Sequence, residues 1–161
     1  MKGEHIKRLL CTFLILCLIP FCVVAETFDF TVNMYDAMAY EMCIPSLPKE
    51  YKTETDEKGV VTRTYTINKY VTLSFQISNN QATGFDVVCY SKDAYIDFIG
   101  VCMCASYSIL PDEGETISSN MLLRFFRASS GKDTNYGFSN HSAFKLSCFD
   151  NGVLYMILRL G

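Results

Sequence analysis

Residues 71–78, VTLSFQIS, alternate strictly between apolar and polar side chains, and this alternation constrains the fold more than any other feature of the chain. In a β-strand, Val71, Leu73, Phe75 and Ile77 would point to one side, while hydroxyl and amide side chains would point to the other. A strand of this kind is half buried. It is typical of an antiparallel sheet that has one face in water.

Strand signals on both sides of this segment extend the predicted sheet. Residues 51–55, 60–67 and 83–90 have strand composition and are separated from one another by short polar turns. Near the C-terminus, Asn151-Gly152 lies between two alternating runs, which is the strongest local signal for a β-hairpin. We therefore expect about six antiparallel strands.

Three segments have helical patterns. They cover residues 31–43, with Thr31 or Asn33 as the N-cap, residues 91–110, with Ser91 as the N-cap, and residues 116–130. In the first helix, methionines recur at every fourth residue from position 34 to position 42, which predicts a buried stripe. The sequence predicts an α+β two-layer sandwich, in which about three helices pack on one face of the sheet, and a single domain over residues 26–161.

The N-terminus has the pattern of a Sec-type secretory signal peptide. Lys2, Lys7 and Arg8 precede an apolar run of about 16 residues, which is short for a membrane-spanning helix. Val23 and Ala25 are small residues suited to signal peptidase, so we expect cleavage after Ala25. The predicted product is secreted or held in the cell envelope, with no stable membrane span after cleavage.

Charge disfavours nucleic acid as a partner. The whole chain carries a formal charge of −3, and residues 1–25 contribute three Lys/Arg and one Glu, so residues 26–161 carry −5. Proteins that bind nucleic acid neutralise phosphates with clustered Lys and Arg. The predicted mature chain has no such cluster, and we expect no nucleic acid and no cofactor.

Five cysteines remain after the predicted cleavage: Cys43, Cys89, Cys102, Cys104 and Cys148. Cys102 and Cys104 are about 200° apart on a helix, so they can form neither a disulfide nor a joint metal site. Cys102 is expected in the core. Cys104 is expected to be more exposed or to contact another element. Separate buried thiols and one disulfide, Cys102 with Cys89 or Cys148, both remain open, and no metal site is expected.

No catalytic motif is present. His141 is the only histidine after the predicted cleavage, so a Cys–His or Ser–His mechanism would have to use it. If a thiol were reactive, the candidates are Cys104 and Cys43.

The hydroxyl-rich side of the predicted sheet is the main candidate for binding. An ordinary water-facing sheet surface would have the same composition, because threonine has a high β-propensity. The leading hypothesis is a small exported, non-catalytic domain that binds a protein or a glycan. The alternatives are a thiol-dependent enzyme or redox protein and an inhibitor of a secreted enzyme. The candidate binding face consists of Thr62, Thr64, Thr66, Thr72, Ser74 and Gln76.

Overall fold

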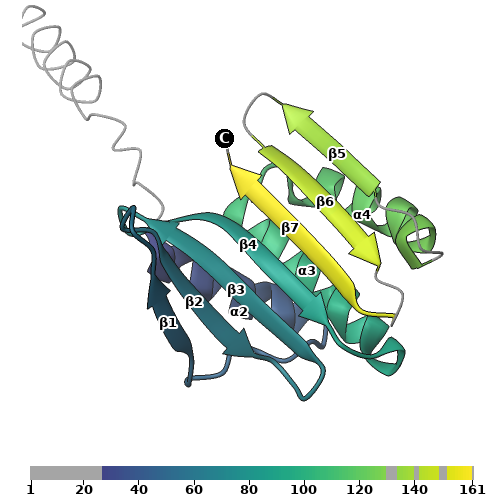
Figure 1. Cartoon of the computed structure of the whole chain (residues 1–161), viewed down its shortest axis with the longest axis horizontal. Helices are drawn as coiled ribbons and strands as arrows, with labels where there is room; N and C mark the ends of the chain where they lie inside the picture. Colours follow the sequence, from purple (N-terminus) through teal and green to yellow (C-terminus); the bar gives the residue numbers. More distant parts are fainter. Residues whose placement is uncertain (1–26, 130–133, 140–141, 149–151, 161) are drawn as a thin grey trace, which may run out of the picture.

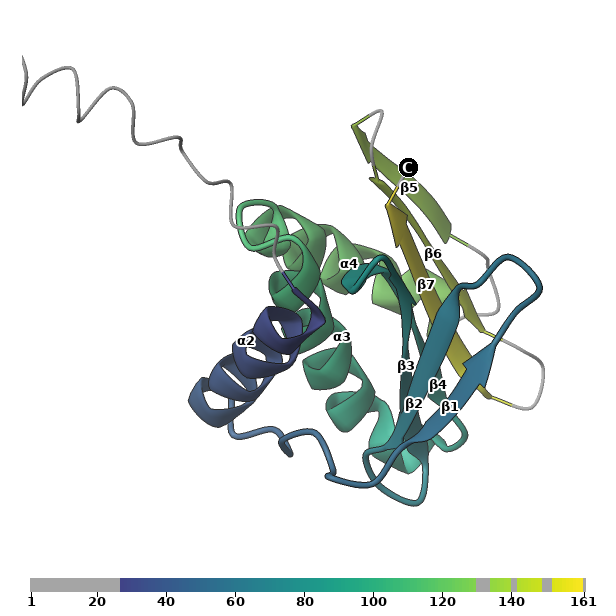
Figure 2. The same cartoon turned by 90° about the vertical axis from the view of Figure 1, so that its left-hand side faces the viewer.

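The computed structural model describes residues 27–129, 134–139, 142–148 and 152–160. They form one antiparallel sheet with three α-helices packed on one face of it (Figures 1 and 2). The predicted α+β two-layer sandwich is confirmed. The predicted signal peptide, residues 1–25, lies outside the described residues. Within them, no helix has the length and apolar character needed to cross a bilayer.

The sheet has seven strands, one more than expected, in the order β1-β2-β3-β4-β7-β6-β5. Two meanders, β1 to β4 and β5 to β7, join where β4 pairs with β7. The additional strand is β5, which pairs with β6 at the edge of the sheet. The strands are β1 Lys52–Thr55, β2 Val61–Thr66, β3 Val71–Ser78, β4 Gln81–Cys89, β5 Thr134–Ser139, β6 Ser142–Cys148 and β7 Leu154–Leu160.

The helices are α2 Phe28–Glu41, α3 Tyr95–Ile109 and α4 Gly114–Ser129, with a short 3-10 helix, η1 Lys92–Ala94, before α3. Helix α2 begins three residues earlier than expected. Its N-cap is Thr27, whose hydroxyl accepts a hydrogen bond from the Phe30 N–H at 3.4 Å. Ser91 caps η1 as predicted, because its hydroxyl accepts from the Asp93 N–H at 3.2 Å.

The alternation in β3 defines the core side of the sheet. Val71, Leu73, Phe75 and Ile77 are buried under the helices, and the polar residues between them are half-buried on the other face. In strand β7 buried and less buried residues alternate in the same way from Leu154 to Leu158. Complete burial of one such apolar side chain stabilises the fold by about 1.5–3 kcal/mol.

The buried stripe of α2 is not the methionine stripe. Thr31, Tyr35 and Ala39 are buried, whereas the methionines lie beside them and are half-buried. Helix α3 is the central helix: it packs against α2, α4, β3 and β4. It is therefore buried on several sides, including that of Cys104. Ser106 and Ser108 are also buried, and their hydroxyls donate to the Cys102 and Ala105 carbonyls at 2.7 and 2.8 Å.

Candidate binding face

The six hydroxyl and amide residues predicted as a binding face lie together on the sheet surface opposite the helices, which we call the open face. In the register of β2 and β3, Thr62 is paired with Gln76, Thr64 with Ser74 and Thr66 with Thr72. Directly opposed residues in an antiparallel pair point to the same side of the sheet. Thr66 is exposed and the other five are half-buried. The register therefore brings the six residues together on one surface, while a binding role for that surface stays a prediction.

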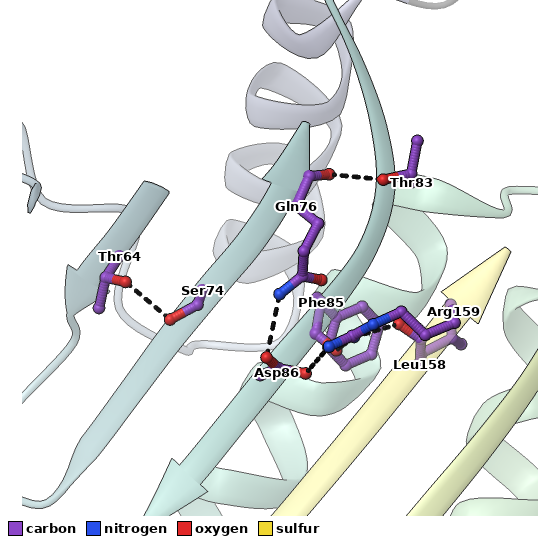
Figure 3. Close-up of polar contacts among 8 residues, drawn as sticks. All are labelled: Thr64, Ser74, Gln76, Thr83, Phe85, Asp86, Leu158 and Arg159. Carbon is purple, nitrogen blue, oxygen red and sulfur yellow. Dashed lines mark hydrogen bonds and ion pairs between the residues drawn. The ribbon is translucent and has the colours of Figure 1, made fainter. Parts of the chain in front are cut away.

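Side-chain hydrogen bonds connect neighbouring strands across the open face (Figure 3). The Thr64 and Ser74 hydroxyls are 2.8 Å apart, and the Gln76 amide nitrogen donates to Asp86 Oδ2 at 2.9 Å. The backbone carbonyl of Gln76 accepts from the Thr83 hydroxyl at 3.3 Å. These bonds link β2 to β3 and β3 to β4, so the polar groups are held in fixed relative positions.

Asp86 and Arg159 continue the network from β4 to β7. Arg159 Nη2 lies 2.7 Å from Asp86 Oδ1. The other terminal nitrogen of Arg159, Nη1, donates to the backbone carbonyls of Phe85 at 3.0 Å and Leu158 at 2.8 Å. Figure 3 shows Asp86 between Gln76 and Arg159. This pair was not predictable from local sequence, because β4 and β7 are far apart in the chain and are brought together only by the topology of the sheet. The only signal was that Asp86 interrupts the apolar run of its strand.

Gly84 is opposite Arg159 in the register and provides the space that the arginine side chain crosses. A Cβ atom at Gly84 would lie 2.5 Å from the Leu158 carbonyl oxygen and 3.0 Å from Arg159 Cδ. Such contacts are closer than van der Waals packing allows. The absence of a side chain at this position therefore lets Arg159 reach Asp86 on the diagonal.

The middle of the open face is partly apolar. In the register, Val88 is paired with Tyr155 and Asp86 with Ile157, and these four side chains are half-buried. Burial raises the pKa of the Tyr155 phenol, and the negative charge of Asp86 raises it further. The tyrosine therefore stays protonated at neutral pH and can donate a hydrogen bond.

A hollow of about 290 Å³ lies at the β1 end of the open face. It is lined by Pro48, Glu50, Tyr51, Lys52, Thr64 and Thr66. The two threonines belong to the predicted binding face, whereas sequence reasoning did not identify the other four residues. They come from the segment that leads into β1, and no local sequence pattern shows that this segment folds beside β2.

Helix α3 buries both cysteines of the 101–106 segment. Cys104 contacts α2, since its thiol lies 3.8 Å from the Met42 sulfur, and it is fully buried. Of the two sequence expectations for Cys104, contact with another element is confirmed and exposure is wrong, because α2 covers that side of the helix. Burial raises the pKa of Cys104 to about 11. Such a thiol contains very little thiolate at neutral pH, which disfavours it as a nucleophile.

No disulfide forms among the five described cysteines, so the proposed bond of Cys102 with Cys89 or Cys148 is not present in this structure. Cys102 is fully buried, and burial raises its pKa well above the usual value, with further contributions from Cys89 and Cys104. The Cys89 thiol donates to the Ser91 carbonyl at 3.1 Å, and burial also raises its pKa. The arrangement is that of separate thiols.

Cys43 differs from the other cysteines. It is exposed, directly after α2, and its φ of +55° places it in the left-handed region. His141 lies outside the described residues, so no thiol–histidine pair is seen within them. Among the described residues, no group of three or more His, Cys, Asp and Glu side chains could hold a metal ion.

No family model, no curated protein and no solved structure matches this chain. The geometry of the open face and of the thiols is therefore the basis for inferring a function.

Proposed function

We propose that this protein is an exported, non-catalytic binding domain whose open face binds a protein or a glycan. The main support for this proposal is the side-chain network that links β2, β3, β4 and β7. It consists of Thr64, Ser74, Gln76, Asp86 and Arg159. A surface whose polar groups are already positioned loses less conformational entropy when a partner binds. The half-buried apolar residues at its middle supply area that a partner can cover.

The thiols support a binding role over a thiol-dependent enzyme. Cys89, Cys102 and Cys104 are buried and have raised pKa values. Reactive cysteines instead need a lowered pKa and access to substrate. For a thiol-dependent enzyme, the remaining candidate is Cys43, which is the one exposed cysteine among the described residues.

Site-specific photocrosslinking tests the binding proposal. Tyr155 on the open face would be replaced by p-azidophenylalanine, which has nearly the same shape. The matched control would carry the same residue at Tyr40, which lies on α2 and is 81% exposed. In cells that make the protein, we expect a defined crosslinked species from position 155 and none from position 40. Equal crosslinking at both positions, or none at position 155, would contradict the proposed binding face.

Export is tested by the intact mass of the protein recovered from its native compartment. A chain that begins at Glu26 supports the proposed signal peptide, because the pattern of residues 1–25 predicts cleavage after Ala25. A full-length chain that stays with the membrane fraction would show that residues 9–24 act as an anchor instead.

A further inference from the structure

Strand β1, Lys52–Thr55, has one unpaired edge. It is the first strand in the sheet order and pairs with β2 on its inner side, and all four of its residues are exposed (Figure 1). Within the part of the chain that the structure describes, no strand pairs with its outer side. The backbone groups on that side can therefore pair with a strand from another molecule.

The turn after β1 shows which backbone groups point outwards. The Asp56 N–H donates to the Val60 carbonyl at 3.0 Å, so the backbone groups of Asp56 point towards β2. Successive residues of an antiparallel strand direct their N–H and C=O groups to alternate sides. The N–H and C=O groups of Thr53 and Thr55 therefore lie on the free edge.

Two charged side chains of β1 restrict what can pair with it. Lys52 is opposite Thr64 and Glu54 is opposite Thr62 in the register with β2, so both charges lie on the open face. Among the described residues, neither side chain has an ion-pair partner. The free edge therefore presents a positive and a negative group in alternate positions on the same face.

A second copy of this chain complements that pattern. When two identical strands pair antiparallel, opposed residues have to lie on the same face, so the two-fold axis passes through a residue. With the axis at Thr53, Lys52 of each copy is opposite Glu54 of the other. The other registers centred within β1 oppose equal charges, which is destabilising: Lys52 with itself, Glu54 with itself, or Glu54 with Asp56. The charges therefore select one register.

The backbone fits the same register. Thr53 directs its N–H and C=O outwards, so the Thr53 residues of the two copies would bond to each other across the axis. Lys52 and Glu54 would form the pairs without backbone hydrogen bonds, in which opposed side chains are closest. On the helix side, Tyr51, which is 48% exposed, would be opposite Thr55 of the other copy. Aromatic and β-branched side chains form favourable cross-strand pairs.

We propose that β1 is a dimerisation edge, at which two copies of this chain pair antiparallel about a two-fold axis at Thr53. The two sheets then form one continuous sheet with both open faces on the same side. A pairing of two four-residue strands buries less than the roughly 1,200–2,000 Å² of a standard interface, so the dimer is weak. This inference goes beyond the proposed function and does not depend on what the open face binds.

Sedimentation equilibrium of the purified protein tests the proposal. We expect a monomer at low concentration and a dimer that accumulates at roughly 0.1–1 mM. Lys52→Glu and Glu54→Lys each change one exposed residue and place like charges opposite each other. Each should weaken dimerisation at least tenfold.

Two combinations of these changes make the test specific. The double variant Lys52→Glu/Glu54→Lys exchanges the two charges within each chain, so it should dimerise like the unmodified protein. An equimolar mixture of the two single variants should also dimerise, because one carries two negative groups at the edge and the other two positive groups. Lys58→Glu, in the turn after β1, is the matched control. It changes the net charge as Lys52→Glu does and should leave dimerisation unchanged.

Thr53→Pro tests the backbone pairing. The N–H that proline lacks points to the free edge, so the pairing of β1 with β2 is kept while the bond across the axis is lost. The variant should stay monomeric at concentrations where the unmodified protein dimerises, with an unchanged circular dichroism spectrum. If this variant did not fold, the charge variants would still decide the question.

Three results would overturn the proposal. They are a monomer over the whole concentration range, a dimer that persists unchanged in both single charge variants, and failure of the double variant or of the mixture to restore the dimer. Crosslinking from position 155 tests the proposed function separately, because β2, β3 and β4 lie between β1 and β7. A dimer without that crosslink would reject the proposed function alone, and the crosslink without a dimer would reject the dimerisation edge alone.

Discussion

Asp86 binds side chains from the strands on both sides of its own. It accepts from Gln76 of β3 and pairs with Arg159 of β7. The Asp86 side chain is 18% exposed and that of Arg159 is 44% exposed, so water and salt screen the pair only in part. Exposed ion pairs contribute about 0–1 kcal/mol, and hydrogen bonds to charged groups about 1.5–3 kcal/mol. Asp86 is therefore the residue that holds the centre of the open face together.

Gly84→Ala should destabilise the protein by about 1–3 kcal/mol, the typical cost of overpacking. The new Cβ would lie 2.5 Å from the Leu158 carbonyl oxygen, which is backbone and cannot turn aside. Urea unfolding would measure the change. Thr83→Ala, in the same strand, is the control and should cost less, since it loses one long hydrogen bond. Because the closest atom is backbone, Arg159→Ala should not rescue Gly84→Ala. Full rescue would contradict this account.

Alkylation should separate the cysteines by their burial. Cys43 is exposed and should react with iodoacetamide in the folded protein, while Cys89, Cys102 and Cys104 should react only after unfolding. Mass spectrometry of samples taken at successive times would identify the modified residues. The rapid labelling should be absent in the Cys43→Ser variant. Rapid modification of Cys104 in the native protein would contradict its buried position and would revive the thiol-dependent alternative.

At the scale of elements, α3 shows both what the sequence predicts and where it fails. The N-cap of η1 and the burial of Cys102 follow from local patterns. The burial of Cys104 does not, because a helical wheel assumes one buried side, whereas α2 and α4 cover two further sides of α3. The alternation of β3 predicts its core face directly. Strand β5 was missed because it contains Gly137 and has an irregular register there.

The candidate binding face was predictable only in part, because local sequence patterns do not show which distant segments pack together. Thr62, Thr64, Thr66 and their partners on β3 belong to consecutive strands, so their juxtaposition follows from the hairpin. Asp86 and Arg159 belong to strands that are far apart in sequence and pair through long-range topology. The hollow also depends on tertiary packing, since residues from the segment that leads into β1 form part of its lining beside β2.

The segment between α2 and β1 packs against α3 through Gly100. A Cβ at Gly100 would lie 2.3 Å from Ile44 Cδ1. Gly100→Ala should therefore destabilise the protein even though alanine is favoured over glycine in a helix by about 1 kcal/mol. Ile44→Ala removes the obstructing atoms and loses buried apolar area. A double-mutant cycle should show that Gly100→Ala is much less costly in the Ile44→Ala background, by about 1 kcal/mol or more. Additive effects would mean that the two residues do not share this contact.

At the scale of the whole molecule, the fold places three thiols and several tyrosines where ionisation is unfavourable. Burial raises the pKa of Cys89, Cys102 and Cys104, and it is also the main reason that the pKa values of Tyr35 and Tyr65 are raised. The helices and the core face of the sheet produce this effect jointly. It predicts how the free energy of unfolding depends on pH.

The free energy of unfolding should fall as pH rises above about 9. A buried thiol keeps its proton up to its raised pKa, about 11 for Cys104, whereas the unfolded chain loses it near the ordinary value of 9.0. The unfolded state then binds fewer protons than the folded state, so alkali favours unfolding. The stabilisation from the buried thiol is complete below the pKa of the thiol in the unfolded chain. It is lost as the pH rises to the pKa of the thiol in the folded protein. Urea titrations at about pH 8 and about pH 10 would measure it.

Two variants connect this loss to the buried thiols. Cys104→Ala removes one of the groups, so the difference in unfolding free energy between about pH 8 and about pH 10 should become smaller, whatever the variant's overall stability. Cys43→Ser changes the exposed thiol and should leave that difference as it is in the unmodified protein. If the unmodified protein were equally stable at both pH values, the thiols would ionise alike in the folded and unfolded chains. Cys104 could then not be enclosed between α2 and α3 as the packing of the two helices requires.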